Sequence, residues 1–193
     1  MTTRESINKI LGFDFNYDEC QTVWEFLLLW NLFENKIFDT EFNVHKAEEY
    51  SEFMDVNEEQ VEDCFNFFKS HYTTETSINH KFESLKFRAT DGKDEVAKVL
   101  IGGSSSTYDK VSSIIVIIYR LRCNLFHGIK DVRKLNQQKN LFEHANMFLI
   151  KCLGYLWLIP FNKVWHLRLI RDHFTKQNNI IREVLLKVCL TDA

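Results

Sequence analysis

The sequence predicts an all-α fold, an antiparallel helical bundle with short connections, and three observations support this class. Apolar residues recur every three or four positions along most of the 193 residues, which is the period of an amphipathic helix. Six Gly and one Pro leave few breaks, and hydrophobic residues make up 45% of the chain, enough for one core. We therefore expect a single helical domain over 1–193, with a core over about 20–160 and a C-terminal helical extension over about 161–193.

The first third of the chain contains three expected helices. The strongest covers residues 20–38, and a short acidic helix is expected over 43–55. Asn57 and Gln60 resemble an N-cap and its capping-box partner, so a third helix is expected over 58–71. The first and third helices each carry an apolar face, made by Val23, Phe26, Leu27, Trp30 and Phe33 in one and by Val61, Phe65 and Phe68 in the other.

Residues 72–106 are less periodic and contain the breaker sequences DGKD and GGSSS, so a mobile connection is expected there. A long helix follows over about 107–126, for which Ser106 and Asp109 supply a weak capping box. The run SSIIVIIY has a high β propensity, so a strand is the alternative. The capping signal and a continuing apolar stripe favour the helix, and the stripe contains Ile114, Ile117, Ile118, Leu121 and Leu125. Gly128 is the expected stop.

A further helix is expected over about 133–158 and should end at Pro160, which cannot continue a helix. The positions expected to face the core are Leu141, Ala145, Phe148, Leu149 and Cys152. The tail over 162–190 has the pattern of a broken helical region.

Charge is distributed unevenly, although the formal net charge is only −3. Residues 1–70 hold 5 Lys or Arg against 16 Asp or Glu, a balance of −11, whereas residues 71–193 hold 19 against 11, a balance of +8. Residues 119–139 alone hold six basic residues against one Asp. A basic surface attracts phosphates, but charge by itself favours the simpler interpretation of an ordinary solvated surface.

Cysteine, hydropathy and histidine patterns limit the class of function. The five Cys are odd in number and include no CxxC, so we interpret them as reduced thiols and expect a cytoplasmic protein. The chain begins with a polar segment, and no apolar run reaches the roughly 18–20 residues of a membrane span, so we expect no signal sequence and no membrane partner. No histidine has ligand spacing to another His or to Cys, so no metal and no cofactor are expected.

Several polar side chains stand close together in residues 119–131, YRLRCNLFHGIKD, at the end of an apolar helix. Arg122 offers a planar set of donors to a phosphate, and His127 titrates near neutrality and can move a proton. Asn124 is a candidate to orient the imidazole or to donate to an oxygen. Such a set suits cleavage of RNA by its own 2′-OH without a metal. The alternative is that His127 caps the helix and Arg122 forms a surface ion pair.

Helix geometry adds a constraint on this pair. Arg122 and His127 are five residues apart, which means about 140° of rotation and about 7.5 Å of rise on an ideal helix. They converge only if the last turn unwinds or a second subunit contributes, so we expect a homodimer through the 107–127 helix. Cys123 is a second chemical candidate as a nucleophile beside His127, although burial is the more common fate of such a cysteine.

RLRCNLFHG resembles the signature of the HEPN superfamily, most closely its Apea-like branch, and FLLLWNLFENKIF resembles the first helix of that family. The resemblance covers about residues 20–160. It implies a bundle of four or five core helices, a homodimer with a composite cleft, and metal-independent endoribonuclease activity of the kind found in phage defence and toxin–antitoxin systems. The family's Arg and His correspond to Arg122 and His127. In many members a polar residue directly follows the Arg, whereas here Cys123 stands there and Asn124 is one position later.

The expected RNA contacts are the basic residues near this pair, namely Arg120, Lys130, Arg133 and Lys134. Glu34 is a supporting candidate that would hold Arg122, although a solvated or capping Glu beside Lys36 is the more ordinary interpretation. RNA, including tRNA, is the expected partner, and the resemblance adds an antitoxin or a sensor protein. Some HEPN proteins bind nucleotides or partners without catalysis, so a binding module and a purely structural bundle remain the alternatives.

Overall fold

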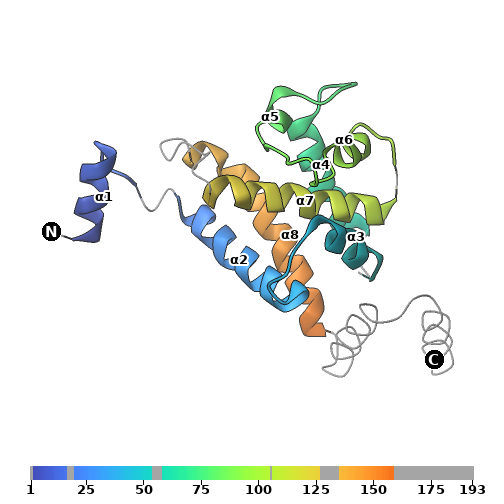
Figure 1. Cartoon of the computed structure of the whole chain (residues 1–193), viewed down its shortest axis with the longest axis horizontal. Helices are drawn as coiled ribbons and strands as arrows, with labels where there is room; N and C mark the ends of the chain where they lie inside the picture. Colours follow the sequence, from blue (N-terminus) through green and yellow to red (C-terminus); the bar gives the residue numbers. More distant parts are fainter. Residues whose placement is uncertain (1, 17–19, 54–57, 105, 127–134, 159–193) are drawn as a thin grey trace. The chain divides into compact units, whose positions relative to one another are not determined.

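The computed structural model describes residues 2–16, 20–53, 58–104, 106–126 and 135–158 (Figure 1). Within these ranges the chain contains no β-strand, and an isolated bridge joins Thr73 to Ile78. The helices are α1 Thr3–Leu11, α2 Gln21–Phe38, α3 Val44–Phe53, α4 Glu58–Tyr72, α5 His80–Glu83, α6 Lys93–Leu100, α7 Thr107–Phe126 and α8 Lys139–Leu158. The predicted all-α class is confirmed, whereas the HEPN-type arrangement stays a prediction.

The chain divides into two compact units, Met1–Leu153 and Gly154–Ala193. The boundary falls within α8, and of the second unit only residues 154–158 are described. The first unit contains the hydrophobic core and every predicted site residue that the structure describes. None of the described helices combines the length and the hydropathy needed to cross a bilayer.

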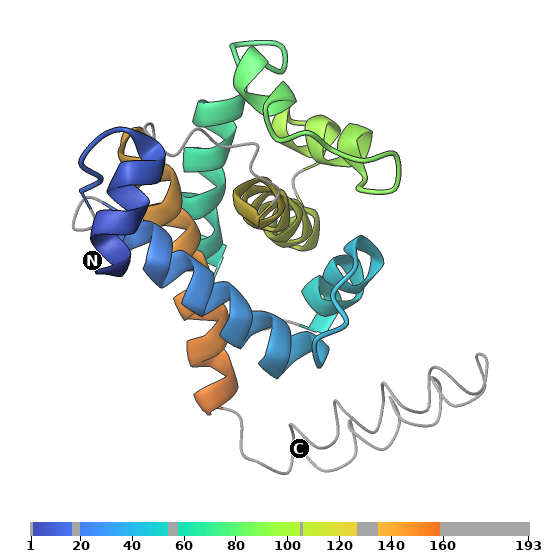
Figure 2. The same cartoon turned by 60° about the vertical axis from the view of Figure 1, so that its left-hand side comes forward.

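α7 is the central helix of the first unit. Figure 2 shows it nearly end-on, with α2, α3, α4, α6 and α8 around it. It packs against α3, α4 and α6, and its Tyr119 ring lies 5.9 Å from Trp30 and 4.8 Å from Phe42, centroid to centroid. Its apolar residues are buried on several sides, including Val111, Ile114, Ile115, Val116, Ile117, Ile118 and Leu121. A helix surrounded in this way loses its amphipathic pattern, which explains why SSIIVIIY also resembled a strand.

Aromatic contacts attach α8 to two other helices. Phe142 of α8 packs on Phe26 of α2 with ring centroids 5.0 Å apart. On another side of α8, His144 stacks on Phe67 of α4 at 3.5 Å between centroids. Because Phe26 and Phe142 are fully buried, these contacts form part of the core that carries α7.

The bounds of the predicted helices agree well with the structure for α2, α3, α4 and α7. The predicted inward residues are buried, except that Leu27 and Leu125 are half-buried. All five inward positions predicted for the last helix are buried, but α8 begins at Lys139, after a 3₁₀ turn over Asn136–Gln138. Several predictions lie outside the described residues, namely those at Asn57, Gly128, 133–134, Pro160 and 162–190.

The structure corrects the expectation of a mobile connection over 72–106, because α5 and α6 lie within it. α6 buries Val96, Val99 and Leu100 and packs on α7. A helix this short is unstable by itself in water, so packing rather than its own sequence stabilises it. α1 was also not predicted, although its signal is visible. Thr2 and Glu5 form a capping box, with the Glu5 N–H donating to Thr2 Oγ1 at 3.2 Å.

Candidate functional site

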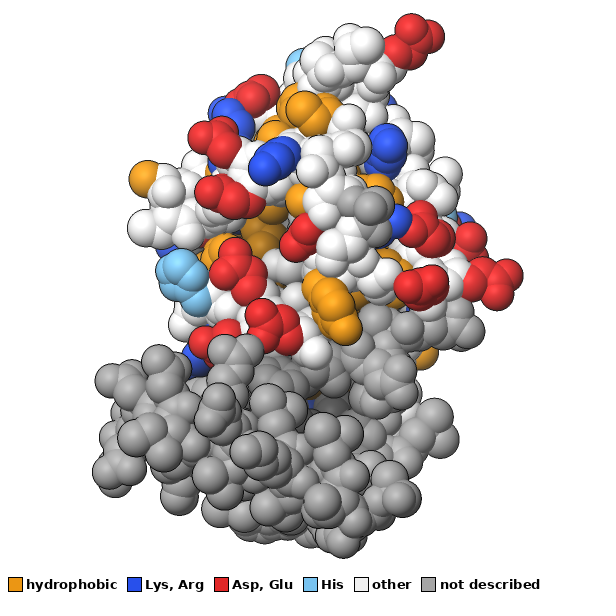
Figure 3. Space-filling view, turned by 90° about the vertical axis from the view of Figure 1, so that its right-hand side faces the viewer, with side chains coloured by type: hydrophobic (Ala, Val, Ile, Leu, Met, Phe, Trp, Pro, Cys, Tyr) orange, Lys and Arg blue, Asp and Glu red, His pale blue; other side chains and the backbone are white. Residues whose placement is uncertain are grey.

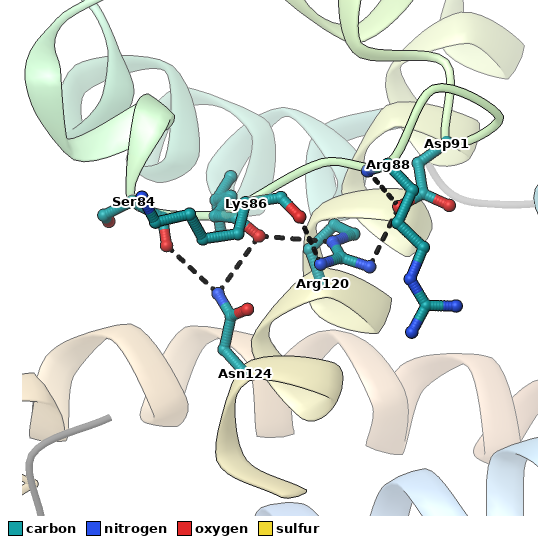
Figure 4. A network of polar contacts seen from close by, with 7 residues as sticks. Ser84, Lys86, Arg88, Asp91, Arg120 and Asn124 are labelled. Carbon is teal, nitrogen blue, oxygen red and sulfur yellow. Dashed lines mark hydrogen bonds and ion pairs between the residues drawn. The ribbon is translucent and has the colours of Figure 1, made fainter. Parts of the chain in front are cut away.

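A buried arginine of α7 fastens the connection between α5 and α6 to the bundle (Figure 4). Arg120 donates from Nε to the Leu85 carbonyl at 3.2 Å and from Nη2 to the Lys86 carbonyl. Its Nη1 lies 2.9 Å from Asp91 Oδ2, which also accepts the Arg88 backbone N–H at 2.8 Å. Arg120 and Asp91 are 3% and 4% exposed, so a complete ion pair is buried here.

Asn124 continues this attachment one turn further along α7, because residues four apart share a helix face. Its Nδ2 donates to the carbonyls of Ser84 and Leu85, both at 3.1 Å. The side chain is fully buried, and its Oδ1 has no hydrogen-bond partner among the described residues. Arg120 and Asn124 therefore supply donors to carbonyls of a connection that lacks regular secondary structure.

Two of the predicted site residues lie inside the bundle. Arg120 was expected to contact RNA, but it is buried and ion-paired, so the structure does not place it on a surface that RNA can reach. Asn124 is also buried, and its amide hydrogens bond to backbone carbonyls, so the side chain is not exposed to a substrate in solvent. The polar pattern of the sequence is real, but at these two positions it satisfies buried backbone groups.

Asn124→Ala should lower the free energy of unfolding by about 1–3 kcal/mol, because it removes a fully buried amide that donates to the Ser84 and Leu85 carbonyls. Thermal unfolding followed by circular dichroism should show a midpoint lower by about 2–4 °C per kcal/mol. Asn35→Ala is the matched control, since Asn35 is exposed on α2. Equal midpoints for the two variants would contradict the anchoring role of Asn124.

Arg122 lies on a different side of α7 and faces the end of α2. Its side chain is 32% exposed, and its Nη2 lies 3.8 Å from Glu34 Oε2. Glu34 is held in turn by Trp30, whose Nε1 donates to the same carboxylate oxygen at 2.9 Å. The structure thus places Glu34 beside Arg122, as the supporting hypothesis requires, rather than in solvent beside Lys36.

The guanidinium of Arg122 makes no hydrogen bond with any described residue. Its contact with Glu34 is too long for one, and its buried Nε has no partner. The guanidinium carbon lies 5.0 Å from the ring centroid of Phe126, which is 62% exposed. A partly exposed cation held between a carboxylate and an aromatic ring is suited to binding a phosphate.

The other predicted site residues lie outside the described residues. These are His127, Lys130, Arg133 and Lys134. The structure therefore brings Arg122 and Glu34 together and leaves the roles of the remaining four as predictions. Among the described residues no group of three or more His, Cys, Asp or Glu is arranged to hold a metal ion.

Cys123 is buried, which agrees with the structural interpretation of this thiol rather than with the nucleophilic one. It lies one turn after Tyr119 on α7. Burial raises the pKa of the Tyr119 hydroxyl, and the Cys123 contact raises it further. Tyr119 therefore stays protonated at neutral pH and serves as a packing residue between α7 and α2.

The sequence analysis did not place Trp30 and Phe126 beside Arg122 and Glu34. The sequence does contain a signal for each, because Trp30 is four residues from Glu34 and Phe126 is four residues from Arg122. The spacing places each pair on one helix face, but it does not say that the two faces meet. That meeting follows from the packing of α2 against α7 through Trp30 and Tyr119.

Comparison of the chain with protein-family models, with curated proteins and with solved structures found no match.

Proposed function

We propose that this protein is a metal-independent endoribonuclease that cleaves RNA by attack of the RNA's own 2′-OH. The observation that carries the proposal is Arg122, a partly exposed cation that lies beside Glu34 and makes no hydrogen bond with any described residue. Arg122 stands five residues before His127 in the sequence. The resemblance of RLRCNLFHG to the HEPN signature supports the same assignment. Phage defence or a toxin–antitoxin system is the setting that this resemblance suggests, with an antitoxin or sensor as a further partner.

The chemistry assigned to the two residues is a transesterification. His127 removes the proton from a 2′-OH, and the resulting oxygen attacks the adjacent phosphorus. Arg122 stabilises the negative charge of the five-coordinate phosphorane, for which a planar cation with several donors is well suited. The bond to the 5′ oxygen then breaks, that oxygen takes a proton from solvent, and His127 returns the proton that it accepted to solvent. The products are a 2′,3′-cyclic phosphate and a 5′-OH, and no water is consumed.

A homodimer completes the site in this proposal. One chain supplies few groups for a phosphate once Arg120 and Asn124 are assigned to its interior. Most of α7 is buried within its own chain, so a contact through the 107–127 helix is confined to exposed residues at its end, such as Phe126. A two-fold contact there brings two copies of Arg122 to one cleft.

His127→Ala should reduce RNA cleavage by about 10²–10⁴-fold, the usual range for removal of a general acid–base group. The wild-type rate should depend on a group that titrates at about pH 6–7, and EDTA should have no effect. The measurement is cleavage of structured RNA and of tRNA by the purified chain, with end-group analysis of the products. His144→Ala is the control, because His144 belongs to α8 and stacks on Phe67 of α4. Products with 5′-phosphate ends, or cleavage by His127→Ala at the wild-type rate, would contradict this mechanism.

A non-catalytic RNA-binding module is the second candidate, and the burial of Asn124 favours it. Without Asn124, the described part of the site retains one cation and one carboxylate, a set that binds phosphate without needing to act on it. Gel-shift and cleavage measurements on the same RNA separate the two candidates. If Arg122→Ala weakens RNA binding and the wild type cleaves no RNA at any pH, the protein is a non-catalytic RNA-binding module.

A further inference from the structure

Phe126, the last residue of α7, is exposed, although phenylalanine is a residue that proteins usually bury. Every other phenylalanine whose side chain the structure describes is buried or half-buried. A single exposed apolar residue is common on protein surfaces and needs no special explanation. What distinguishes Phe126 is therefore its neighbour rather than its exposure.

The neighbour is Arg122, one turn earlier on the same face of α7. Its guanidinium carbon lies over the Phe126 ring, 5.0 Å from the centroid. Since the cation covers one face of the ring, the exposed area of Phe126 belongs to the other face and the edge. The contact also restricts both side chains, which lowers the conformational entropy that is lost when a ligand binds to them.

Two other aromatic side chains are exposed among the described residues, Trp24 of α2 and Tyr108 of α7, and no described cation lies over either ring. Tyr108 stands at the opposite end of α7, where acidic side chains gather on the face that includes α3 and the start of α7 (Figure 3). RNA phosphates are repelled there, whereas Arg122 attracts them. Phe126 is thus the exposed ring that a bound phosphate would approach.

The packing of α2 against α7 fixes the position of Arg122. Its Nη2 lies 3.8 Å from Glu34 Oε2, and the same carboxylate oxygen accepts a hydrogen bond from Trp30 Nε1 at 2.9 Å. Trp30 is buried, and its ring lies 5.9 Å from that of Tyr119 on α7. Arg122 is therefore positioned by residues of the core, so a phosphate that it binds lies next to the exposed ring.

We propose that Phe126 stacks on an unpaired base of the RNA whose phosphate Arg122 binds. The phosphate meets the guanidinium, and the base of the same or the next nucleotide lies on the open face of the ring. A nucleotide suits this pair because it combines an anion with a flat aromatic group. The inference rests on the proposed function for its ligand, RNA, and adds the residue that contacts the base.

A protein contact is the alternative use of this ring, and its size argues against it. One aromatic side chain buries about 150–250 Å², whereas each partner of a standard interface buries about 800 Å². The preceding residues Cys123 and Asn124 are buried and Leu125 is half-buried, so they do not extend the exposed apolar surface. A two-fold contact at this end of α7 must therefore draw most of its area from residues other than Phe126.

Stacking on Phe126 selects among RNA ligands. In a duplex each base is paired and already stacks on its neighbours, so the ring reaches only an unpaired base. A purine offers a larger π surface than a pyrimidine. A purine should therefore bind more tightly than a pyrimidine at the stacked position.

The test is a thermodynamic cycle between the ring and the base. The full chain is titrated by fluorescence anisotropy with labelled single-stranded oligomers of 2′-O-methyl RNA, which cannot be cleaved because the attacking hydroxyl is blocked. One oligomer carries a single adenine, one a single uracil, and one is entirely abasic. The wild type should bind the adenine oligomer about tenfold more tightly than the abasic one, with uracil between them, whereas Phe126→Leu should bind all three alike.

Two further variants are the controls for this cycle. Phe126→Trp keeps an aromatic ring and should keep the preference for adenine. Tyr108→Leu alters the exposed ring at the acidic end of α7 and should bind the three oligomers as the wild type does. Light scattering on each variant measures its oligomeric state, which should match that of the wild type.

The outcomes separate base stacking from catalysis. If the wild type cleaves RNA but binds the adenine and abasic oligomers equally, stacking is wrong and the endoribonuclease proposal stands. If it prefers adenine but cleaves no RNA, stacking stands and the catalytic proposal fails. If Phe126→Leu changes the oligomeric state and weakens binding of all three oligomers by the same factor, the ring is a protein contact and the stacking proposal is overturned.

Discussion

Arg122→Ala should abolish RNA cleavage while leaving helix content and the unfolding midpoint almost unchanged. Arg122 is one-third exposed and its ion pair with Glu34 spans 3.8 Å, so its loss should alter the free energy of unfolding by only about 0–1 kcal/mol. The expected loss of activity is large because Arg122 is the residue proposed to stabilise the negative charge of the phosphorane. Cleavage rates and circular dichroism spectra of the same preparation measure both effects.

Three further variants sharpen this test. Arg122→Lys keeps the charge but loses the planar set of donors, so its activity should lie between wild type and Arg122→Ala. Glu34→Gln should lower activity less than Arg122→Ala, since Glu34 positions the arginine without touching RNA. Lys81→Ala, at an exposed lysine on α5, should leave cleavage unchanged. If Arg122→Ala unfolds the chain, the arginine is structural and the proposed site loses its main support.

Arg120→Ala should give the opposite result, a loss of about 3–5 kcal/mol in the free energy of unfolding. The substitution leaves Asp91 as an uncompensated buried charge and removes the donors that Arg120 supplies to the Leu85 and Lys86 carbonyls. Urea denaturation of wild type and variant measures the difference. Any loss of RNA cleavage by this variant should follow its unfolded fraction rather than exceed it.

Two companion variants separate the charge from the hydrogen bonds. Arg120→Met combined with Asp91→Asn removes both charges, so it should be more stable than Arg120→Ala alone. It should not regain wild-type stability, because the Lys86 carbonyl still lacks the donor that Arg120 supplied, whereas the Leu85 carbonyl keeps Asn124. A wild-type midpoint for Arg120→Ala would show that the connection between α5 and α6 does not depend on this ion pair.

The contrast between these two arginines rests on helix geometry. Arg120 and Arg122 are two residues apart, which turns them about 200° from each other around the axis of α7. One therefore faces the α5–α6 connection and the other faces α2. The string RLRCN shows that two cations are present, but it carries no information about which lies inside.

Local periodicity and capping determined the all-α class and the bounds of α2, α3, α4 and α7 from the sequence, because long helices carry an apolar face that repeats many times. The same pattern found the inward positions of α8. The cluster of polar residues at the end of α7 singled out Arg122 as a candidate, with Glu34 as its supporting residue. Both lie at the ends of helices whose pattern is strong.

Tertiary structure decided what the pattern could not. α6 forms because its few apolar residues pack on α7, and Arg120 and Asn124 turn inward because the α5–α6 connection brings unpaired carbonyls to that side. Trp30 joins the region of Arg122 because α2 packs on α7 there. Each outcome depends on contacts between residues about 20 to 90 positions apart in the sequence, and such contacts leave no periodic trace in either segment alone.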